Sequence, residues 1–340
     1  MYSDEDLDAA VAAGVLRSAD VAGFRAFTAE RRSEGAVDEE QFRLLTGFND
    51  IFVSVAILLL LGAAGWLGSG ISPAVGGGIV AGLSWALAEY FTRRRRMALP
   101  SIVLLLGFAV GLFGLGAGSF HGFAAGGLPG PTVELPFAAG AALAAVGTYL
   151  HWRRFMVPIT VAAGVAAAIG TLLLTVMALV PAVSGHWPLL LLAGGLAVFA
   201  FAMAWDASDR TRSTRRADVA FWLHLSAAPM IVHPIFSMLG LLGQGDTDLV
   251  RAGAAIAIYL LLALVALAVD RRALLVSALF YVLYAMSALF RAAGSLSASF
   301  ALTALVIGSA LLLLSALWHR ARAGVLAALP PGLRARLPVV

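Results

Sequence analysis

The sequence predicts an all-α membrane protein, in which a small N-terminal helical hairpin precedes a transmembrane bundle of about ten helices. Hydrophobic residues make up 61% of the chain and charged residues 12%, whereas soluble domains carry about 25% charged residues. Apolar runs recur from Asp50 to Ala321, each close to the ~20 residues that a helix needs to cross a bilayer. Lysine is absent, and arginine is concentrated in alternate connections between the runs.

The first 45 residues are predicted to be a separate cytosolic unit. Ser3 followed by acidic residues is typical of a helix N-cap, and Gly14 is expected to end that helix. Ser18 is expected to cap a second helix that ends near Gly35, and a third helix begins near Asp38 and continues into the first span. This hairpin could shield the cytoplasmic mouth of the bundle or dock a protein partner.

Residues 46–320 are predicted to form the transmembrane domain, and residues 321–340 a short cytosolic tail. The expected spans are 50–69, 73–92, 98–117, 135–152, 156–180, 187–205, 218–242, 251–269, 272–292 and 298–318. An even number of spans places the two termini on the same side of the membrane.

The arginine pattern predicts the orientation of the bundle. The connections after the second, fourth, sixth and eighth spans hold twelve arginines, whereas the opposite connections hold only Arg251 and Arg291. Basic loops remain in the cytoplasm, so both termini are expected there, with the chain in a bacterial inner membrane. The net charge of +4 lies mainly in these short loops, which favours anionic lipid headgroups, and no nucleic acid, as partners.

Glycine-rich faces on the second and third spans are predicted to be helix contacts, because small residues let membrane helices approach closely. The second span carries Gly76-Gly77-Gly78 and Gly82, which include the step Gly78-x-x-x-Gly82, and the third has Gly107, Gly111 and Gly114 on neighbouring turns.

The seventh span is the richest in candidate functional residues. Pro229 and Pro234 each remove a backbone donor and are expected to kink or break the helix near mid-membrane, either as a packed kink or at a binding site. His224 and His233 are nine residues apart, which puts them on opposite faces of a helix and argues against a joint haem or metal site. Either histidine alone could respond to protons.

The ninth span carries a polar stripe that looks like a hydrated face turned inward. Its members fall within an arc of about 120° on a helical wheel. They are Ser277, Tyr281, Tyr284, Ser287 and Arg291. Arg291 could snorkel outward, pair with Asp246 or Asp248, or attract an anionic group of a substrate.

Two acidic positions near the cytoplasmic ends have simpler interpretations. Glu89 precedes Arg93 by one helical turn, which favours an interfacial ion pair over proton coupling. Asp206 and Asp209 lie among four arginines and are interpreted as part of a solvated basic loop.

Recognisable enzyme motifs are missing, and no catalytic residue, metal site or cofactor is predicted. The sequence lacks a Gly-x-Ser-x-Gly elbow, a His-Glu-x-x-His helix and a phosphate-binding loop with lysine. Absent cysteine excludes thiolate chemistry and disulfides, and absent lysine excludes Schiff bases.

The chain resembles a group of uncharacterised bacterial polytopic membrane proteins with a short N-terminal helical hairpin. The residues that carry this resemblance are Gly47-Phe48-Asn49-Asp50-Ile51-Phe52-Val53, Phe221-Trp222-Leu223-His224 and Pro229. The resemblance covers most of the length but implies no activity and no functional residues. Ten spans also match the number in drug/metabolite-type exporters, without any internal repeat in this sequence.

Two main classes of function follow from these observations. The first is a secondary transporter or permease for a small solute or lipid-like molecule, proton-coupled through His224, His233 or Glu89. The second is a membrane-anchored scaffold or signalling protein that acts through its N-terminal hairpin. An intramembrane enzyme is a third alternative.

Overall fold

The computed structural model is helical throughout the part of the chain that it describes. The described residues are 7, 10–24, 27, 48–124, 134–210, 212, 214–240, 249–292, 299–334 and 337. The chain divides into two compact units, Met1–Arg43 and Leu44–Val339, which are considered separately.

In the N-terminal unit, residues 10–12 and 18–24 are helical. Gly14 follows the first of these segments with φ +71°, the left-handed conformation that commonly ends a helix. The Val15 N–H donates to the Ala10 carbonyl at 2.9 Å and completes this termination. Val21 is buried on the second segment. The predicted acidic first turn and the third helix lie outside the described residues, so the hairpin stays a prediction.

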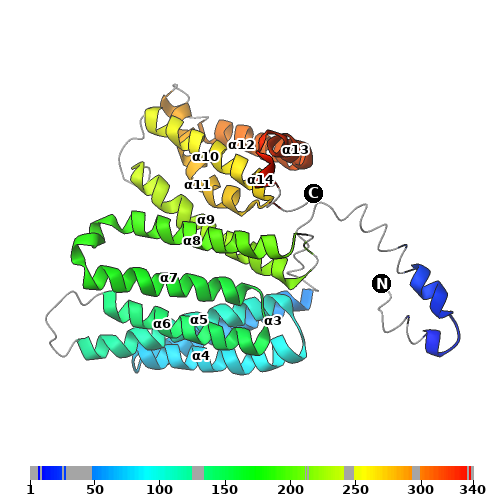
Figure 1. Cartoon of the computed structure of the whole chain (residues 1–340). Helices are drawn as coiled ribbons and strands as arrows, with labels where there is room; N and C mark the ends of the chain where they lie inside the picture. Colours follow the sequence, from blue (N-terminus) through cyan, green and yellow to red (C-terminus); the bar gives the residue numbers. More distant parts are fainter. Residues whose placement is uncertain are drawn as a thin grey trace. The chain divides into compact units, whose positions relative to one another are not determined.

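The second unit consists of helices that follow one another along the chain (Figure 1). They are α3 (Phe48–Ser69), α4 (Pro73–Ala88), η1 (Glu89–Arg94), α5 (Ala98–Ala124), α6 (Glu134–Phe155), α7 (Ile159–Leu179), η2 (Pro181–His186), α8 (Trp187–Ser208), α9 (Arg215–Met238), α10 (Leu249–Val269), α11 (Ala273–Ala292), α12 (Ser299–Ala316), α13 (Trp318–Ala328) and α14 (Pro331–Arg334).

Seven helices among the described residues are long and apolar enough to cross a membrane, or eight if a bent pair is counted as one span. Their length and composition are those of an integral membrane protein. Every predicted span coincides with a helix, but α6 and α11 are not among those that meet the criterion. α6 ends in His151, Arg153 and Arg154, which lowers its apolarity. The number of ten spans therefore stays a prediction.

Helices α4 and α5 pack through glycines, as predicted, and Gly111 of α5 is in the contact, whereas Gly78 and Gly82 of α4 do not make a close approach. Gly82 has no neighbour within 4 Å of an added Cβ, and Gly78 would make only an ordinary contact. The close approach is one residue away, at Gly77, where an added Cβ would collide with the backbone of α5. A Cβ on Gly111 would lie 2.5 Å from the backbone nitrogen of Ala81. The glycines predicted on the two helices therefore include the residues in contact, but the closest approach of α4 is at Gly77 and not at the Gly78-x-x-x-Gly82 step.

Helix α9 is continuous from Arg215 to Met238 with Pro229 and Pro234 inside it, so the prolines do not divide it into two half-helices. The break occurs elsewhere. Helices α12 and α13 meet at a bend of 77°. Residues 318–328, predicted to be the end of a span and a tail, therefore form a separate helix that turns away from α12.

The arginine-rich connections contact one another. Arg154, in the last turn of α6, binds Glu89 of η1 at 2.7 Å, and Arg215 of α9 donates to the Met156 carbonyl after α6 at 3.5 Å. Arg212, between α8 and α9, binds Asp270 after α10 at 2.7 Å. These contacts gather the basic connections at one end of the second unit, here called the arginine-rich end.

Candidate functional site

Helix α9 is the most enclosed of the seven membrane-crossing helices. Within its most apolar stretch, 56% of the residues are buried inside the protein, against 17–33% for the other six. It packs along α8 and also contacts α7 and α11. A polar side chain on α9 therefore faces protein rather than lipid, which is the position where ionisable residues in membrane helices usually have a function.

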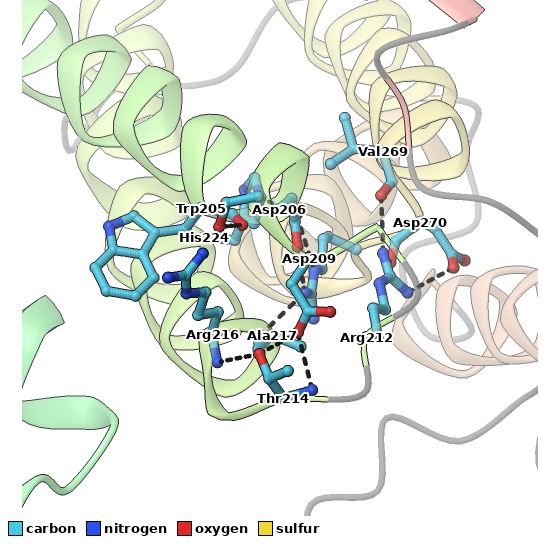
Figure 2. A network of polar contacts seen from close by, with 12 residues as sticks. Trp205, Asp206, Asp209, Arg212, Thr214, Arg216, Ala217, His224, Val269 and Asp270 are labelled. Atoms are coloured by element: carbon cyan, nitrogen blue, oxygen red, sulfur yellow. Dashed lines mark hydrogen bonds and ion pairs between the residues drawn. The ribbon is translucent and has the colours of Figure 1, made fainter.

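The site centres on a buried contact between Asp206, near the end of α8, and His224 of α9 (Figure 2). The His224 Nε2 atom lies 2.9 Å from Asp206 Oδ2, and the two side chains are 0% and 1% exposed. Asp206 and His224 face each other because α8 and α9 run antiparallel through a short connection, so the last turn of one lies beside an early turn of the other.

Arg271 completes the cluster from the connection between α10 and α11. Its Nη2 donates to Asp206 Oδ1 at 2.6 Å and its Nε to Asp206 Oδ2 at 3.3 Å. Nη2 also donates to the Ala217 carbonyl in the first turn of α9 at 3.2 Å. The guanidinium is 3% exposed, so one buried carboxylate is shared by a buried cation and a buried imidazole. We call these three residues the Asp206 cluster.

The hydrogen-bond pattern defines the tautomer of His224. A carboxylate only accepts hydrogen bonds, so Nε2 carries the proton that points at ionised Asp206. The other ring nitrogen, Nδ1, is buried and has no hydrogen-bond partner. Phe199 of α8 lies edge-on to the ring with 5.1 Å between centroids. Burying an acceptor without a hydrogen bond in an apolar environment costs free energy. A second proton on the imidazole would bind at this nitrogen, Nδ1.

The α8–α9 connection is shaped by a second acid, Asp209, which is also buried. Its Oδ2 accepts from the Thr214 hydroxyl at 2.6 Å and from the Thr214 N–H at 3.0 Å (Figure 2). The Thr214 hydroxyl accepts from the Arg216 N–H and so caps α9. These bonds fix the start of α9, and thereby the position along the helix axis at which His224 faces Asp206.

A neighbouring cluster is built around Asp270, which precedes Arg271. Asp270 Oδ2 accepts from Arg212 Nη1 at 2.7 Å, and Asp270 Oδ1 accepts from the Trp318 indole N–H at 2.7 Å. Arg322 Nε of α13 lies 3.8 Å from Oδ1. Burial opposes ionisation of Asp270, but Trp318 and the two guanidinium groups outweigh it and hold the pKa of Asp270 below its usual range.

Two residues in left-handed conformations position this second cluster. Asp270 has φ +60° and Arg212 has φ +53°. The left-handed Asp270 ends α10, and the Arg271 N–H returns to the Ala266 carbonyl at 3.0 Å. The reversal of the chain at Asp270 sends the adjacent Asp270 and Arg271 side chains to different partners.

The second predicted histidine, His233, lies two and a half turns further along α9 and has a different environment. Its Nδ1 is 2.7 Å from the Tyr281 hydroxyl of α11. Phe236 stacks on Tyr281 at 4.7 Å, and Trp187 of α8 lies 5.8 Å from the imidazole. The separation of the two histidines agrees with their predicted opposite faces, and each has found a polar partner on a different neighbouring helix.

Glu89 forms the predicted ion pair with Arg93, at 3.3 Å. Arg154 of α6 is a closer partner, because its Nε and Nη2 donate to the two carboxylate oxygens at 2.7 and 2.9 Å. This forked contact ties η1 to the end of α6, so the position of Glu89 is explained by helix packing.

The remaining predicted site residues give less information. Pro229 and Pro234 lie inside continuous α9. On the polar stripe of α11, the side chains of Tyr284, Ser287 and Arg291 lie outside the described part. Of the two described members, Ser277 is half-buried and Tyr281 contacts His233.

The residues that the sequence interpretation missed are Asp206, Arg271 and Asp270. Asp206 was interpreted as solvated, yet it is 1% exposed, because α9 and the α10–α11 connection cover it. The available signal was its position directly after Ala204-Trp205, still inside the apolar helix. Arg271 belongs to the arginines that predict the orientation of the bundle, and nothing in its local sequence distinguishes it from exposed Arg216.

His151 is another buried polar residue that was expected only to mark a helix end. It is fully buried, with Nδ1 3.3 Å from the Thr160 hydroxyl, and it packs against Trp85, Phe108 and Phe155. Within the described residues, no three histidine or carboxylate side chains come together as a metal site would require.

Comparison with protein-family models, with curated proteins and with solved structures finds no match to this chain. The arrangement of the site therefore carries the functional argument.

Proposed function

We propose that this integral membrane protein is a secondary transporter for a small solute or lipid-like molecule and that His224 couples transport to protons. The observation that carries the proposal is the Asp206 cluster, in which an imidazole and a guanidinium share one carboxylate inside an enclosed helix. Ionisable groups are costly at such positions and recur in the proton relays of pumps and transporters.

The cluster has the chemistry of a proton switch. When His224 is neutral, the negative charge of Asp206 is balanced by Arg271, and Nδ1 holds an unused lone pair. A proton bound at Nδ1 makes His224 a second cation next to the same carboxylate. The two cations then compete for Asp206, so the protonation state changes the strength of the contact between α8 and the α10–α11 connection.

The proposal keeps the architecture that the sequence favours, with ten spans and both termini in the cytoplasm of a bacterium. Anionic lipid headgroups would then neutralise exposed arginines at the arginine-rich end, and the resemblance to uncharacterised polytopic membrane proteins would reflect a shared fold. Single cysteines test the orientation, because the chain has none of its own. A membrane-impermeant maleimide applied to intact cells should label Gly185→Cys and spare Ser208→Cys, whereas the reverse result would invert the map.

Transport is tested with purified protein in liposomes that contain a pH-sensitive dye. Under an imposed pH gradient, a panel of small solutes is expected to include at least one that increases proton flux into the liposomes. The flux should be lost in His224→Gln and kept in His186→Gln, since His186 ends η2 and is exposed. Equal solute-driven flux in the wild-type and His224→Gln proteins would contradict the coupling role.

A scaffold or signalling function through the N-terminal unit is the second candidate. It is favoured by the separate compactness of residues 1–43 and by Phe24 and Phe27, which are 51% and 56% exposed. If deletion of residues 1–43 abolishes a cellular phenotype that His224→Gln leaves intact, this function replaces the transporter.

A further inference from the structure

We infer that two crossed ion pairs, Asp206–Arg271 and Arg212–Asp270, form a gate at the arginine-rich end, and that a proton on His224 opens this gate. The inference deepens the proposed function and uses the same site. In a transporter, such a gate would separate the interior of the bundle from the cytoplasm.

The two ion pairs are crossed because each of two chain segments contributes one acid and one base. The α8–α9 hairpin supplies the acid Asp206 and the base Arg212, and the α10–α11 connection supplies the acid Asp270 and the base Arg271. Each element therefore gives one charge of each sign to the other. The two pairs together favour one position of the α8–α9 hairpin relative to the α10–α11 connection. A displacement between these two segments separates both acids from their bases.

The second ion pair has a brace from the C-terminal part of the chain. Trp318 donates to Asp270 at 2.7 Å, and the Arg272 guanidinium lies over the Trp318 ring at 4.7 Å from its centroid. Trp318 is the first residue of α13, directly after the 77° bend. The bend thus places the indole against the α10–α11 connection rather than at the end of a straight span.

His224 is connected to the gate through Asp206. Arg271 makes two contacts with the Asp206 carboxylate, and His224 makes one with the oxygen Oδ2 that Arg271 Nε also reaches. The charged groups that act on the imidazole are Asp206 of α8, Arg271 of the α10–α11 connection and Arg212 of the α8–α9 connection. Asp218, on α9 itself, is exposed. A proton on His224 adds positive charge beside Arg271 and strengthens the competing contact of His224 with Asp206. Arg271 is the group that can leave, because it belongs to a connection between helices.

The gate is tested by a distance between spin labels, which needs neither a substrate nor transport. Labels are attached to Ser208→Cys at the end of α8 and Val276→Cys at the start of α11, both on exposed positions. At neutral pH in liposomes, the labelled protein should show one short distance, and acidification should shift it to a longer one. Arg271→Gln should give the long distance at both pH values, whereas Arg215→Gln should behave as the wild type.

Charge reversal tests the pairing itself. Arg212→Asp alone should give the long distance, because it places two acids together. Adding Asp270→Arg should return the distance toward the short value only in part, because position 270 also faces Arg322 and the Trp318 N–H. His224→Gln should keep the short distance and lose the response to pH. The inference is overturned if acidification, Arg271→Gln and Arg212→Asp all leave the distance unchanged.

If the charge variants aggregate on size-exclusion chromatography, the comparison of the pH response of labelled wild-type protein with that of His224→Gln decides the question alone. The label distance and the solute-coupled proton flux are separate readouts, so the gate and the transporter can fail independently. A pH-dependent distance without any solute-coupled proton flux would support the gate and refute the transporter. Coupled flux with a fixed distance would support the transporter and refute the gate.

Discussion

The two halves of the membrane unit, α3–α6 and α8–α11, are held together in part by different physical means. Close glycine contacts occur in both halves, since a Cβ on Gly195 of α8 would lie 2.8 Å from the backbone of Met230 in α9. Helices α8–α11 are joined in addition by buried charges at their arginine-rich end. In the first half a Cβ on Gly140 would lie 2.5 Å from the Phe113 carbonyl oxygen, so backbones almost touch. In the second half, Asp206, His224 and Arg271 are all at most 3% exposed.

If the proposed function is correct, this difference separates a scaffold from a part that changes state. Close backbone contacts have no alternative partner and depend little on pH. A buried carboxylate with two competing donors has two arrangements of similar chemistry, and protonation chooses between them. In the proposed mechanism, the first half would therefore serve as the frame and the second half would carry the switch.

The largest expected effect is the removal of Arg271. Arg271→Gln leaves Asp206 buried without its cation, and breaking such a pair costs about 3–5 kcal/mol in the free energy of unfolding. Denaturant unfolding in detergent measures it, with exposed Arg215→Gln as the control. Adding Asp206→Asn should recover much of the loss, since no buried charge then remains. A loss below 1 kcal/mol in Arg271→Gln would show that the cluster is solvated.

The corresponding test for the first half is Gly111→Ala. The new Cβ would be 2.5 Å from the Ala81 nitrogen, so α4 and α5 must separate, at a cost of about 1–3 kcal/mol. Gly82→Ala is the matched control on a helix face with open space, and it is expected to be neutral or stabilising by up to about 1 kcal/mol. Equal effects of the two changes would remove the contrast between the halves.

The brace between α13 and the gate predicts a smaller, pH-dependent effect. Trp318→Phe removes a hydrogen bond to the Asp270 carboxylate and should cost about 1.5 kcal/mol at neutral pH. Because the folded-state pKa of Asp270 is lowered, the stability that its ionisation contributes is complete above its unfolded pKa of about 3.9. That contribution is lost as the pH falls through the folded-state value. Thermal unfolding across this range should show the wild type and Asp270→Asn converging in stability at low pH, and a constant difference would argue against an ionised partner.

The smallest expected effect is at the other histidine. Tyr281→Phe removes the hydroxyl that lies 2.7 Å from His233, with an expected loss of about 1 kcal/mol. Because this pair lies outside the crossed ion pairs, the label distance between positions 208 and 276 should not change. A change in that distance would mean that the two histidine sites are coupled along α9.

The sequence was sufficient to predict the helices and much less informative about the buried charges. Apolar length and arginine distribution predicted where each helix lies, because a bilayer imposes both on the local sequence. The periodicity also predicted that His224 and His233 face different neighbours. Asp206 and Arg271 are 65 residues apart, and their contact depends on how α10 and α11 pack beside α9, which no local pattern encodes. The glycines were predicted as contacts from the sequence, but which of them makes the closest approach, Gly77 rather than Gly78 or Gly82, also depends on how the helices pack.

The central claim is that His224 is a neutral imidazole with its proton on Nε2, poised to accept a second proton at Nδ1. Nitrogen-15 magnetic resonance of histidine-labelled protein in lipid, with His224→Gln to assign the signal, tests this directly. The account predicts one protonated and one bare ring nitrogen at neutral pH, and two protonated nitrogens after acidification of the folded protein. A His224 ring whose two nitrogen signals stay unchanged over the whole pH range of the folded state would contradict it.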